Sequence, residues 1–200
     1  MTLSIFIDGG LSIAEGGRNP LRLLWLRWGR YLAARHRGVR VDRTCLIHPE
    51  ARINPRGSQL TIGARSTVAP GACIQGPVTI GEDCTVQIYS VLVGVRDGGP
   101  ITIGNHVHIA PHVMMFAANH KFADTDIPIC QQGSEAAPIT IEDDVWVAGK
   151  VMITAGVRIG RGSVIGAGAV VTKDIPPWSV AVGVPARVIR SRKEHASETA

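Results

Sequence analysis

The sequence predicts an all-β fold, a solenoid of short strands, from one repeating pattern. Aliphatic residues recur at every sixth position through most of the chain, and four residues after most of them stands another small or β-branched side chain. A period of six fits neither a helix, at 3.6 residues per turn, nor one alternating strand. Six residues can form a short strand and a turn, so three such units close a triangular coil, and stacked coils bury the aliphatic positions in one core.

The composition supports this fold class. The 200 residues include 23 glycines and 12 prolines, and only 4% are aromatic, which favours short strands and tight turns over helices. The hydrophobic content of 45% is ample for one domain with a buried core and leaves little room for a second.

The repeat predicts the strands in order and sets the domain boundaries. It begins at Val41 and shifts frame at the turn-like "PRGSQ" and again at "GVRDGGP". It stops after Met115 and resumes at Ile141. We therefore expect a β-helix over residues 41–182, an extruded loop at 117–138 and a C-terminal segment at 183–200. The aliphatic positions are Val41, Ile47, Ile53, Ile62, Val68, Ile74, Ile80, Val86, Leu92, Ile103, Ile109, Met115, Ile141, Val147, Ile153, Ile159, Ile165 and Val171.

Residues 1–40 break the strand pattern. Between Asn19 and Gly38, leucines and aromatic residues are interleaved with arginines, and Pro20 and Gly38 stand where a helix would begin and end. We interpret this stretch as one amphipathic helix. It would cap the open end of the solenoid, or touch an anionic membrane or a lipid-linked substrate through its tryptophans and arginines, and the two roles are compatible.

Charge and cysteine usage bound the partners and the compartment. The net charge of +5 favours anionic partners such as phosphorylated cofactors, and we expect no nucleic-acid partner. Cys45, Cys73, Cys84 and Cys130 are widely spaced without a C-x-x-C pair, so we expect reduced thiols and no zinc site. No secretory signal and no bilayer-spanning apolar run is evident. We expect a cytoplasmic protein, at most peripheral to the inner face of the membrane.

Two stretches carry a family resemblance. The segment "ITIEDDVWVAGKVMITAGVRIGRGSVIGAGAVVTKDIPPWSVAVGVPARVIR" resembles the C-terminal half of hexapeptide-repeat acyltransferases. The segment "NHKFADTDIPICQQG" resembles the loop of their sugar, polysaccharide and xenobiotic O-acetyltransferase branch. The resemblance covers residues 41–190. It implies a left-handed parallel β-helix, a homotrimer with active sites between neighbouring subunits, and acetyl-CoA as the acyl donor.

The chemistry of acyl transfer then indicates the catalytic base. Transfer from a thioester to a hydroxyl needs a base for the hydroxyl proton and donors for the developing oxyanion. Histidine suits the first role because its pKa of about 6.5 lies near working pH. His120 follows Asn119 where the strand pattern fails, so it should face a groove at the edge of a coil, and it matches the histidine of the family's N-H motif. We predict direct transfer with His120 as the base.

The expected acceptor is a sugar hydroxyl in surface polysaccharide or glycoconjugate synthesis. Phe122 offers a stacking surface for a sugar, or anchors the loop. Asp124 shapes the loop, or orients the base or a sugar hydroxyl. Ser90 and Asp97 lie where the family's acceptor-binding polar groups would fall, although its sugar acetyltransferases carry Asn and Asp there. Asn119 completes the expected acceptor site.

By the same resemblance, acetyl-CoA lies along the C-terminal coils. The pantetheine would run beside Trp146, Gly149 and Ala167, where small residues let the backbone approach the ligand, and the Gly149 amide would help to hold the thioester oxygen. Polar and basic residues at the end of the solenoid would bind the CoA phosphates, namely Thr172, Lys173, Arg187 and Arg190.

Other functions remain open at this point. An antibiotic or other xenobiotic acceptor shares the same loop motif, and an amino sugar could accept acetyl on nitrogen. His106, His108 and His112 suggest a metal-dependent hydratase, because gamma-class carbonic anhydrases bind metal on a similar solenoid. The crowding of these histidines does not match that family, so we expect no metal. A non-catalytic scaffold would keep the solenoid for assembly alone.

Overall fold

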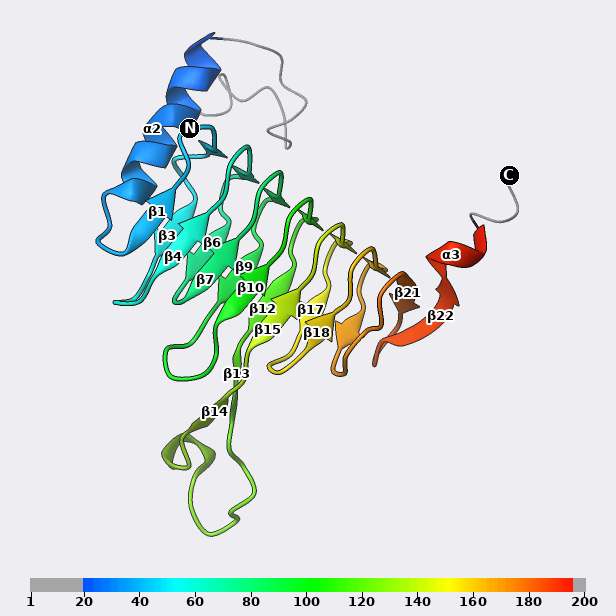
Figure 1. Ribbon diagram of the computed structural model, residues 1–200. Helices are drawn as coiled ribbons and strands as arrows, with labels where there is room; N and C mark the ends of the chain where they lie inside the picture. Colours follow the sequence, from blue (N-terminus) through cyan, green and yellow to red (C-terminus); the bar gives the residue numbers. More distant parts are fainter. Residues whose placement is uncertain (1–19, 196–200) are drawn as a thin grey trace.

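The computed structural model describes residues 20–195, which form a parallel β-solenoid with an N-terminal helix and a projecting arm (Figure 1). Most strands are two or three residues long, because the chain turns a corner after each one. Successive strands of a coil enter three different parallel sheets in turn, so the coil has three sides. The predicted fold class is confirmed.

Three parallel sheets form the sides of the solenoid, and we call them A, B and C. Sheet A contains β1 (Val39–Val41), β4 (Leu60–Ile62), β7 (Val78–Ile80), β10 (Ile101–Ile103), β15 (Ile139–Ile141) and β18 (Arg158–Ile159). Sheet B contains β2 (Leu46–Ile47), β5 (Thr67–Val68), β8 (Thr85–Val86), β11 (His108–Ile109), β16 (Trp146–Val147), β19 (Val164–Ile165), β21 (Ser179–Val182) and the antiparallel β22 (Arg187–Ser191). Sheet C contains β3 (Arg52–Asn54), β6 (Cys73–Gln75), β9 (Val91–Val93), β12 (Met114–Phe116), β17 (Met152–Ile153) and β20 (Val170–Val171).

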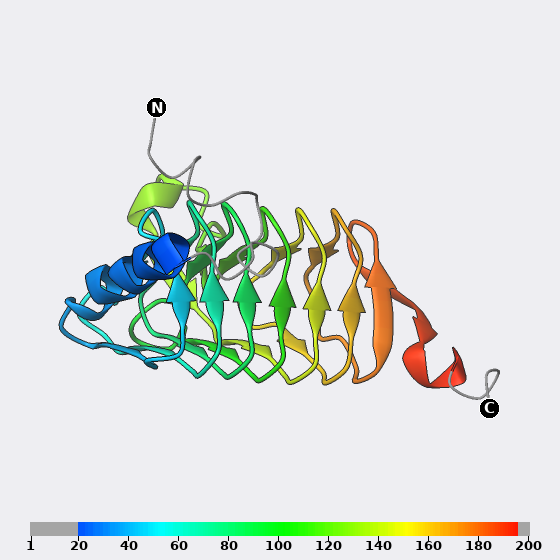
Figure 2. The same cartoon turned by 90° about the horizontal axis from the view of Figure 1, so that it is seen from above.

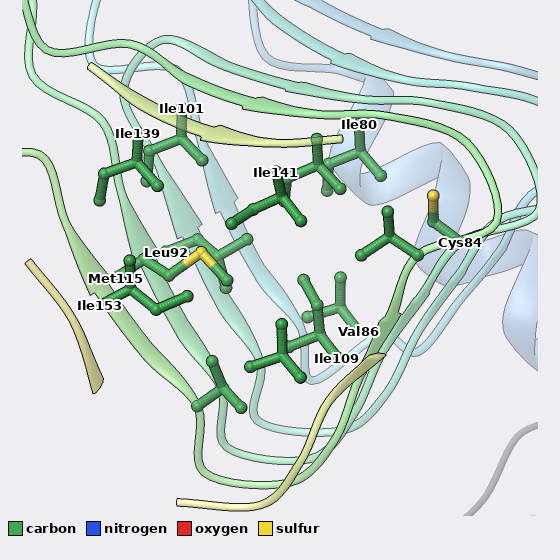
Figure 3. Close-up of a cluster of buried hydrophobic side chains, with 14 of the residues drawn as sticks. Ile80, Cys84, Val86, Leu92, Ile101, Ile109, Met115, Ile139, Ile141 and Ile153 are labelled. Carbon is green, nitrogen blue, oxygen red and sulfur yellow. The ribbon is translucent and has the colours of Figure 1, made fainter. Parts of the chain in front are cut away.

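The core is the aliphatic ladder that the repeat predicts. In-register pairing stacks Ile62, Ile80, Ile103 and Ile141 in sheet A, and all four side chains are buried. Figure 3 shows side chains from the three sheets converging on one interior, with Met115 of sheet C among them. Each coil alone could not exclude water from these side chains, so the stacking of coils creates the core.

Small polar residues at the corners link successive coils. Ser66, Ser90 and Ser163 are buried, and each hydroxyl donates to a carbonyl of the next coil and accepts from the amide three residues beyond it. Cys45 and Cys84 fill equivalent slots, each with its thiol 3.0 Å from a carbonyl oxygen of the next coil. Burial raises the pKa of Cys45 to about 11, so these thiols stay protonated in the fold. All four cysteines are free thiols.

The chain turns at three edges, which we call A–B, B–C and C–A after the sheets that they join. The three insertions into the period of six each follow a strand of sheet C, at residues 55–59, 94–100 and 117–138, so all three lie on the C–A edge. The Arg96 guanidinium ties the first two together, because it donates to the carbonyls of Arg56 and Gly57.

The predicted N-terminal helix is present as α2 (Pro20–Ala34), and it packs against the first coil at one end of the solenoid (Figures 1 and 2). Leu26, Gly29 and Ala33 face the coil and are buried. A side chain at Gly29 would collide with the backbone of β2 and the turn that follows, so a glycine is needed for this close approach. The helix ends at Ala34, four residues before Gly38, and residues 35–38 turn into β1.

The remaining boundaries differ from the prediction in detail. The C-terminal segment expected at 183–200 contributes β22 to sheet B and a short helix, α3 (Arg192–His195). The first 19 residues of the expected N-terminal segment, and residues 196–200, lie outside the described residues. Within residues 20–195, no helix combines the length and apolar character needed to cross a bilayer.

Candidate active site

The loop predicted at 117–138 is a structured arm that leaves the solenoid at the C–A edge (Figure 1). Its elements are β13 (Ala118–His120), the 3-10 helix η1 (Ile129–Gln131) and β14 (Ser134–Ala136). β13 and β14 pair antiparallel, and the Ala137 amide donates to the Ala117 carbonyl where the arm returns to the coils. The interruption of the repeat is therefore a paired ribbon anchored at its base.

His120 is the last residue of β13, and the strand pairing sets it opposite Ser134. Its side chain is exposed and lines a hollow of about 680 Å³ in the arm. Asn119 and Phe122 line the same hollow, and the Phe122 ring is 73% exposed. Asp124 lines it too, so the structure brings four of the predicted site residues to one concave surface.

A glutamine outside the predicted site residues holds the arm together. Gln132 accepts a hydrogen bond from the Asp124 amide at 3.1 Å, and its side-chain amide donates to the carbonyls of Asp124 and Ile127. The Asp124 carboxylate accepts from the Asp126 amide at 2.9 Å. These contacts fit the loop-shaping alternative for Asp124, and within the described arm no hydrogen bond joins it to His120. Gln132 lies eight residues after Asp124 in the chain, so only the folded arm reveals their contact.

Asp97 and Ser90 have different surroundings. Asp97 is exposed in the turn between β9 and β10, on the edge that carries the arm, and the next residue, Gly98, lies close to Ala136 of β14. Ser90 is fully buried, and both hydrogen bonds of its hydroxyl are made inside the solenoid. The expectation that Ser90 contacts an acceptor does not fit the structure, because the repeat position that it occupies points inward.

The residues expected beside pantetheine lie along sheet B and the B–C edge. Trp146 is 50% exposed on β16, next to His108 of β11. Gly149 and Ala167 follow β16 and β19 at the B–C edge, where the Gly168 amide donates to the Gly149 carbonyl at 2.9 Å. These residues therefore border one continuous strip of surface.

The four residues expected to bind CoA phosphates lie on β22 and in the turn after β20. Thr172 and Lys173 follow β20 at the C–A edge and are exposed. Arg187 and Arg190 are exposed on β22, which pairs with β21 in sheet B. The two pairs belong to neighbouring segments, because the Ala186 amide donates to the Val170 carbonyl of β20 at 2.8 Å. Their joint role in binding the CoA phosphates stays a prediction.

Within one chain, the predicted base and the predicted pantetheine strip also lie on different edges. The arm with His120 leaves the C–A edge, whereas Gly149 and Ala167 stand on the B–C edge. Sheet C lies between these two edges. A reaction that uses both groups therefore needs a second copy of the chain or a rearranged arm.

His106, His108 and His112, which are close in sequence, have different surroundings in the fold. His106 lies 3.8 Å from an Asp83 oxygen at the A–B edge, and His108 shares a 2.6 Å hydrogen bond with Thr85 on sheet B. The ring of His112 stacks on Tyr89 at the B–C edge. Across the part of the chain that the structure describes, no group of three or more histidine, cysteine or acidic side chains is arranged to hold a metal ion.

A family model and curated proteins of known sequence match parts of this chain. The family model "Bacterial transferase hexapeptide (six repeats)" matches residues 138–173. The galactoside O-acetyltransferase of Escherichia coli strain K12 is 39% identical over 131 residues, which cover 62% of this chain and 63% of that protein. A Schizosaccharomyces pombe protein provisionally assigned as an acetyltransferase is 52% identical over 91 residues, 45% of this chain and 42% of its own length. The chain thus spans about half of the length of these relatives.

Solved structures share the fold over most of the chain. A hexapeptide-repeat acetyltransferase from Vibrio cholerae O1 biovar eltor, complexed with acetyl-CoA, is 30% identical with a TM-score of 0.55, and the match covers 94% of this chain and 82% of that one. AntD, an N-acyltransferase from Bacillus cereus in complex with dTDP and 3-hydroxybutyryl-CoA, gives a TM-score of 0.71 at 24% identity, covering 84% of this chain and 90% of that one. The second likeness is one of fold alone.

Proposed function

Because the chain belongs to the hexapeptide-repeat acyltransferase family, we propose that it transfers an acetyl group from acetyl-CoA to a sugar hydroxyl, in the synthesis of a surface polysaccharide or glycoconjugate. The observation that carries the proposal is the placement of His120, exposed on the paired arm and lining its hollow. The Vibrio cholerae structure with acetyl-CoA supports the donor, and the Escherichia coli galactoside O-acetyltransferase supports a sugar hydroxyl as acceptor.

In this mechanism His120 moves one proton twice. Its neutral imidazole takes the proton of the acceptor hydroxyl as the oxygen attacks the thioester carbonyl, and the imidazolium returns that proton to the departing thiolate. The products are the acetyl ester and the free thiol, so no covalent enzyme intermediate is needed. Gly149 would donate its amide to the developing oxyanion, and Phe122 and Asn119 would position the sugar in the hollow.

The separation of the edges favours a site shared between copies. His120 and Gly149 stand on different edges of one chain, with sheet C between them. If a neighbouring copy presents its B–C edge to the arm, one copy supplies the base and the other supplies Trp146 and the thioester site. This arrangement accords with the homotrimer that the family resemblance implies.

The test compares two histidine variants. His120→Ala should lower kcat about a hundred- to ten-thousand-fold, because general-base catalysis contributes that much. Its thermal stabilisation by acetyl-CoA should match the wild type, since binding to the native state raises stability whether or not turnover follows. His106→Ala, an exposed histidine on the A–B edge, is the matched control and should turn over normally. Unimpaired turnover by His120→Ala would remove the assigned base.

A mixing experiment tests the shared site. A side chain at Gly149 would meet only the Pro111 carbonyl, at 3.4 Å, so Gly149→Val should fold while it blocks approach to the thioester. Mixed assemblies of His120→Ala and Gly149→Val chains should regain activity that neither variant has alone. If mixing restores nothing, the base and the donor site belong to the same chain.

The acceptor class is tested by substrate competition. Release of free thiol from acetyl-CoA is measured against oligosaccharides, nucleotide sugars, amino sugars and antibiotics at equal concentrations. We expect the highest kcat/KM with a neutral sugar that accepts acetyl on a hydroxyl. A higher value with an amino sugar, or with an antibiotic, would replace this acceptor with a nitrogen or xenobiotic one.

A further inference from the structure

The helix α2 carries a second apolar face on the side away from the solenoid. Leu24, Trp28 and Tyr31 are 59%, 50% and 59% exposed, and their spacing of four and three residues puts them on one side of the helix. The Trp28 and Tyr31 rings stack with their centroids 5.3 Å apart. We call these three residues the outer stripe.

The outer stripe is not needed to hold α2 on the first coil. That contact is made by the opposite side of the helix, where Leu26, Gly29 and Ala33 are buried. A contiguous apolar surface rimmed by polar groups marks an interaction site more often than a stray exposed side chain does. The stripe is therefore available to something outside the described chain.

The charge on α2 and the residues just after it has one sign. The sequence contains no Asp or Glu between residues 20 and 41, and Arg27, Arg35 and Arg37 are exposed within or just after α2. None of these three arginines forms an ion pair within residues 20–195. The other arginines that do form ion pairs there lie on the coils or at the C-terminal end. A partner for this face must therefore be apolar and negatively charged.

We infer that the outer stripe docks α2 on an anionic lipid surface, a role beyond the proposed acetyl transfer. Leu24, Trp28 and Tyr31 would enter the boundary between headgroups and acyl chains, and the arginines would bind lipid phosphates. With 15 residues, α2 is about 22 Å long, too short to span the bilayer, so it lies along the surface. A second copy fits less well, because pairing two stripes brings like-charged arginines together.

Docking leaves the candidate active site open to water. The arm points away from α2 in Figure 1, from the opposite side of the solenoid. The acceptor would therefore reach His120 from the aqueous side, and membrane binding should not change the rate of acetyl transfer to a soluble acceptor.

The test uses the full chain with lipid vesicles in a sedimentation assay. It should bind vesicles of phosphatidylcholine mixed with phosphatidylglycerol about tenfold or more tightly than pure phosphatidylcholine, and added salt should weaken binding by screening the arginines. The triple variant Leu24→Ser, Trp28→Ser, Tyr31→Ser should lose about tenfold or more of that affinity. Its oligomeric state and its acetyl transfer should stay unchanged, because the stripe touches neither the core nor the arm.

Matched controls separate the possible occupants. Ile189→Ser removes an exposed apolar side chain on β22, at the other end of the solenoid, and should bind vesicles as the wild type does. Replacing Arg27, Arg35 and Arg37 with Gln should remove the preference for the anionic lipid. Equal binding by the stripe variant, or no binding by the wild type, overturns the inference. A change in oligomeric state would assign the stripe to a second copy and also overturns it.

Discussion

The buried hydroxyl of Ser90 gives a sharp test of the difference between a structural and an acceptor-binding role. Ser90 Oγ donates to the Ala110 carbonyl at 3.0 Å and accepts from the Val113 amide at 3.2 Å, linking its coil to the next. Ser90→Ala removes both hydrogen bonds, at about 0.5–1.5 kcal/mol each, and leaves a buried amide without its partner, at about 1–3 kcal/mol. Because these costs overlap, we expect a loss of about 2–4 kcal/mol in the free energy of unfolding.

The assay is urea denaturation followed by circular dichroism, with kinetics measured where both proteins are folded. The denaturation midpoint should fall at an unchanged slope, since the surface exposed on unfolding is the same. The KM for the acceptor should not move. Ser90→Cys is the matched variant, because Cys45 and Cys84 fill equivalent slots with a thiol donor, and it should lose about 1 kcal/mol or less.

Two results would refute this reasoning. A Ser90→Ala protein within about 0.5 kcal/mol of the wild type would show that the coil-to-coil hydrogen bonds contribute little. A raised KM for the acceptor with unchanged stability would restore Ser90 to the acceptor site.

Three further predictions concern glycines of the coils and the cysteines. Gly76 has a φ of 77°, and a side chain there would collide with the Gly94 backbone, so Gly76→Ala should lower the free energy of unfolding in urea by about 3 kcal/mol. Gly168 has a φ of 72° and open space around it, so Gly168→Ala should lower it by about 1 kcal/mol. Equal losses in the two variants would contradict the steric argument. In native protein a thiol reagent should modify exposed Cys130 first and spare Cys45 until unfolding. Burial raises the pKa of Cys45 from 9.0 to about 11, so the contribution of its thiol to stability is complete below pH 9 and is lost as pH rises toward 11. The urea midpoint of the wild type should therefore fall more across that range than that of Cys45→Ser, and an equal fall in both would contradict the prediction.

The sequence by itself determined the scaffold and the element that carries the candidate base. A repeat of six residues over eighteen aliphatic positions admits one solution, because only stacked three-sided coils bury all of those positions at once. The break in the repeat located the arm, and the Asn119-His120 pair marked the candidate base on it. These inferences needed only local periodicity and the chemistry of side chains.

The tertiary structure alone decided which residues can meet. The frame shifts and the arm lie on one edge because each follows a strand of sheet C, a grouping that depends on the closing of the coil. The same closure turns Ser90 inward and sets His120 and Gly149 on different edges. It also leaves Leu24, Trp28 and Tyr31 outside, because the first coil can bury only one face of α2. Proximity between residues far apart in the chain comes from packing, and a one-dimensional period does not contain it.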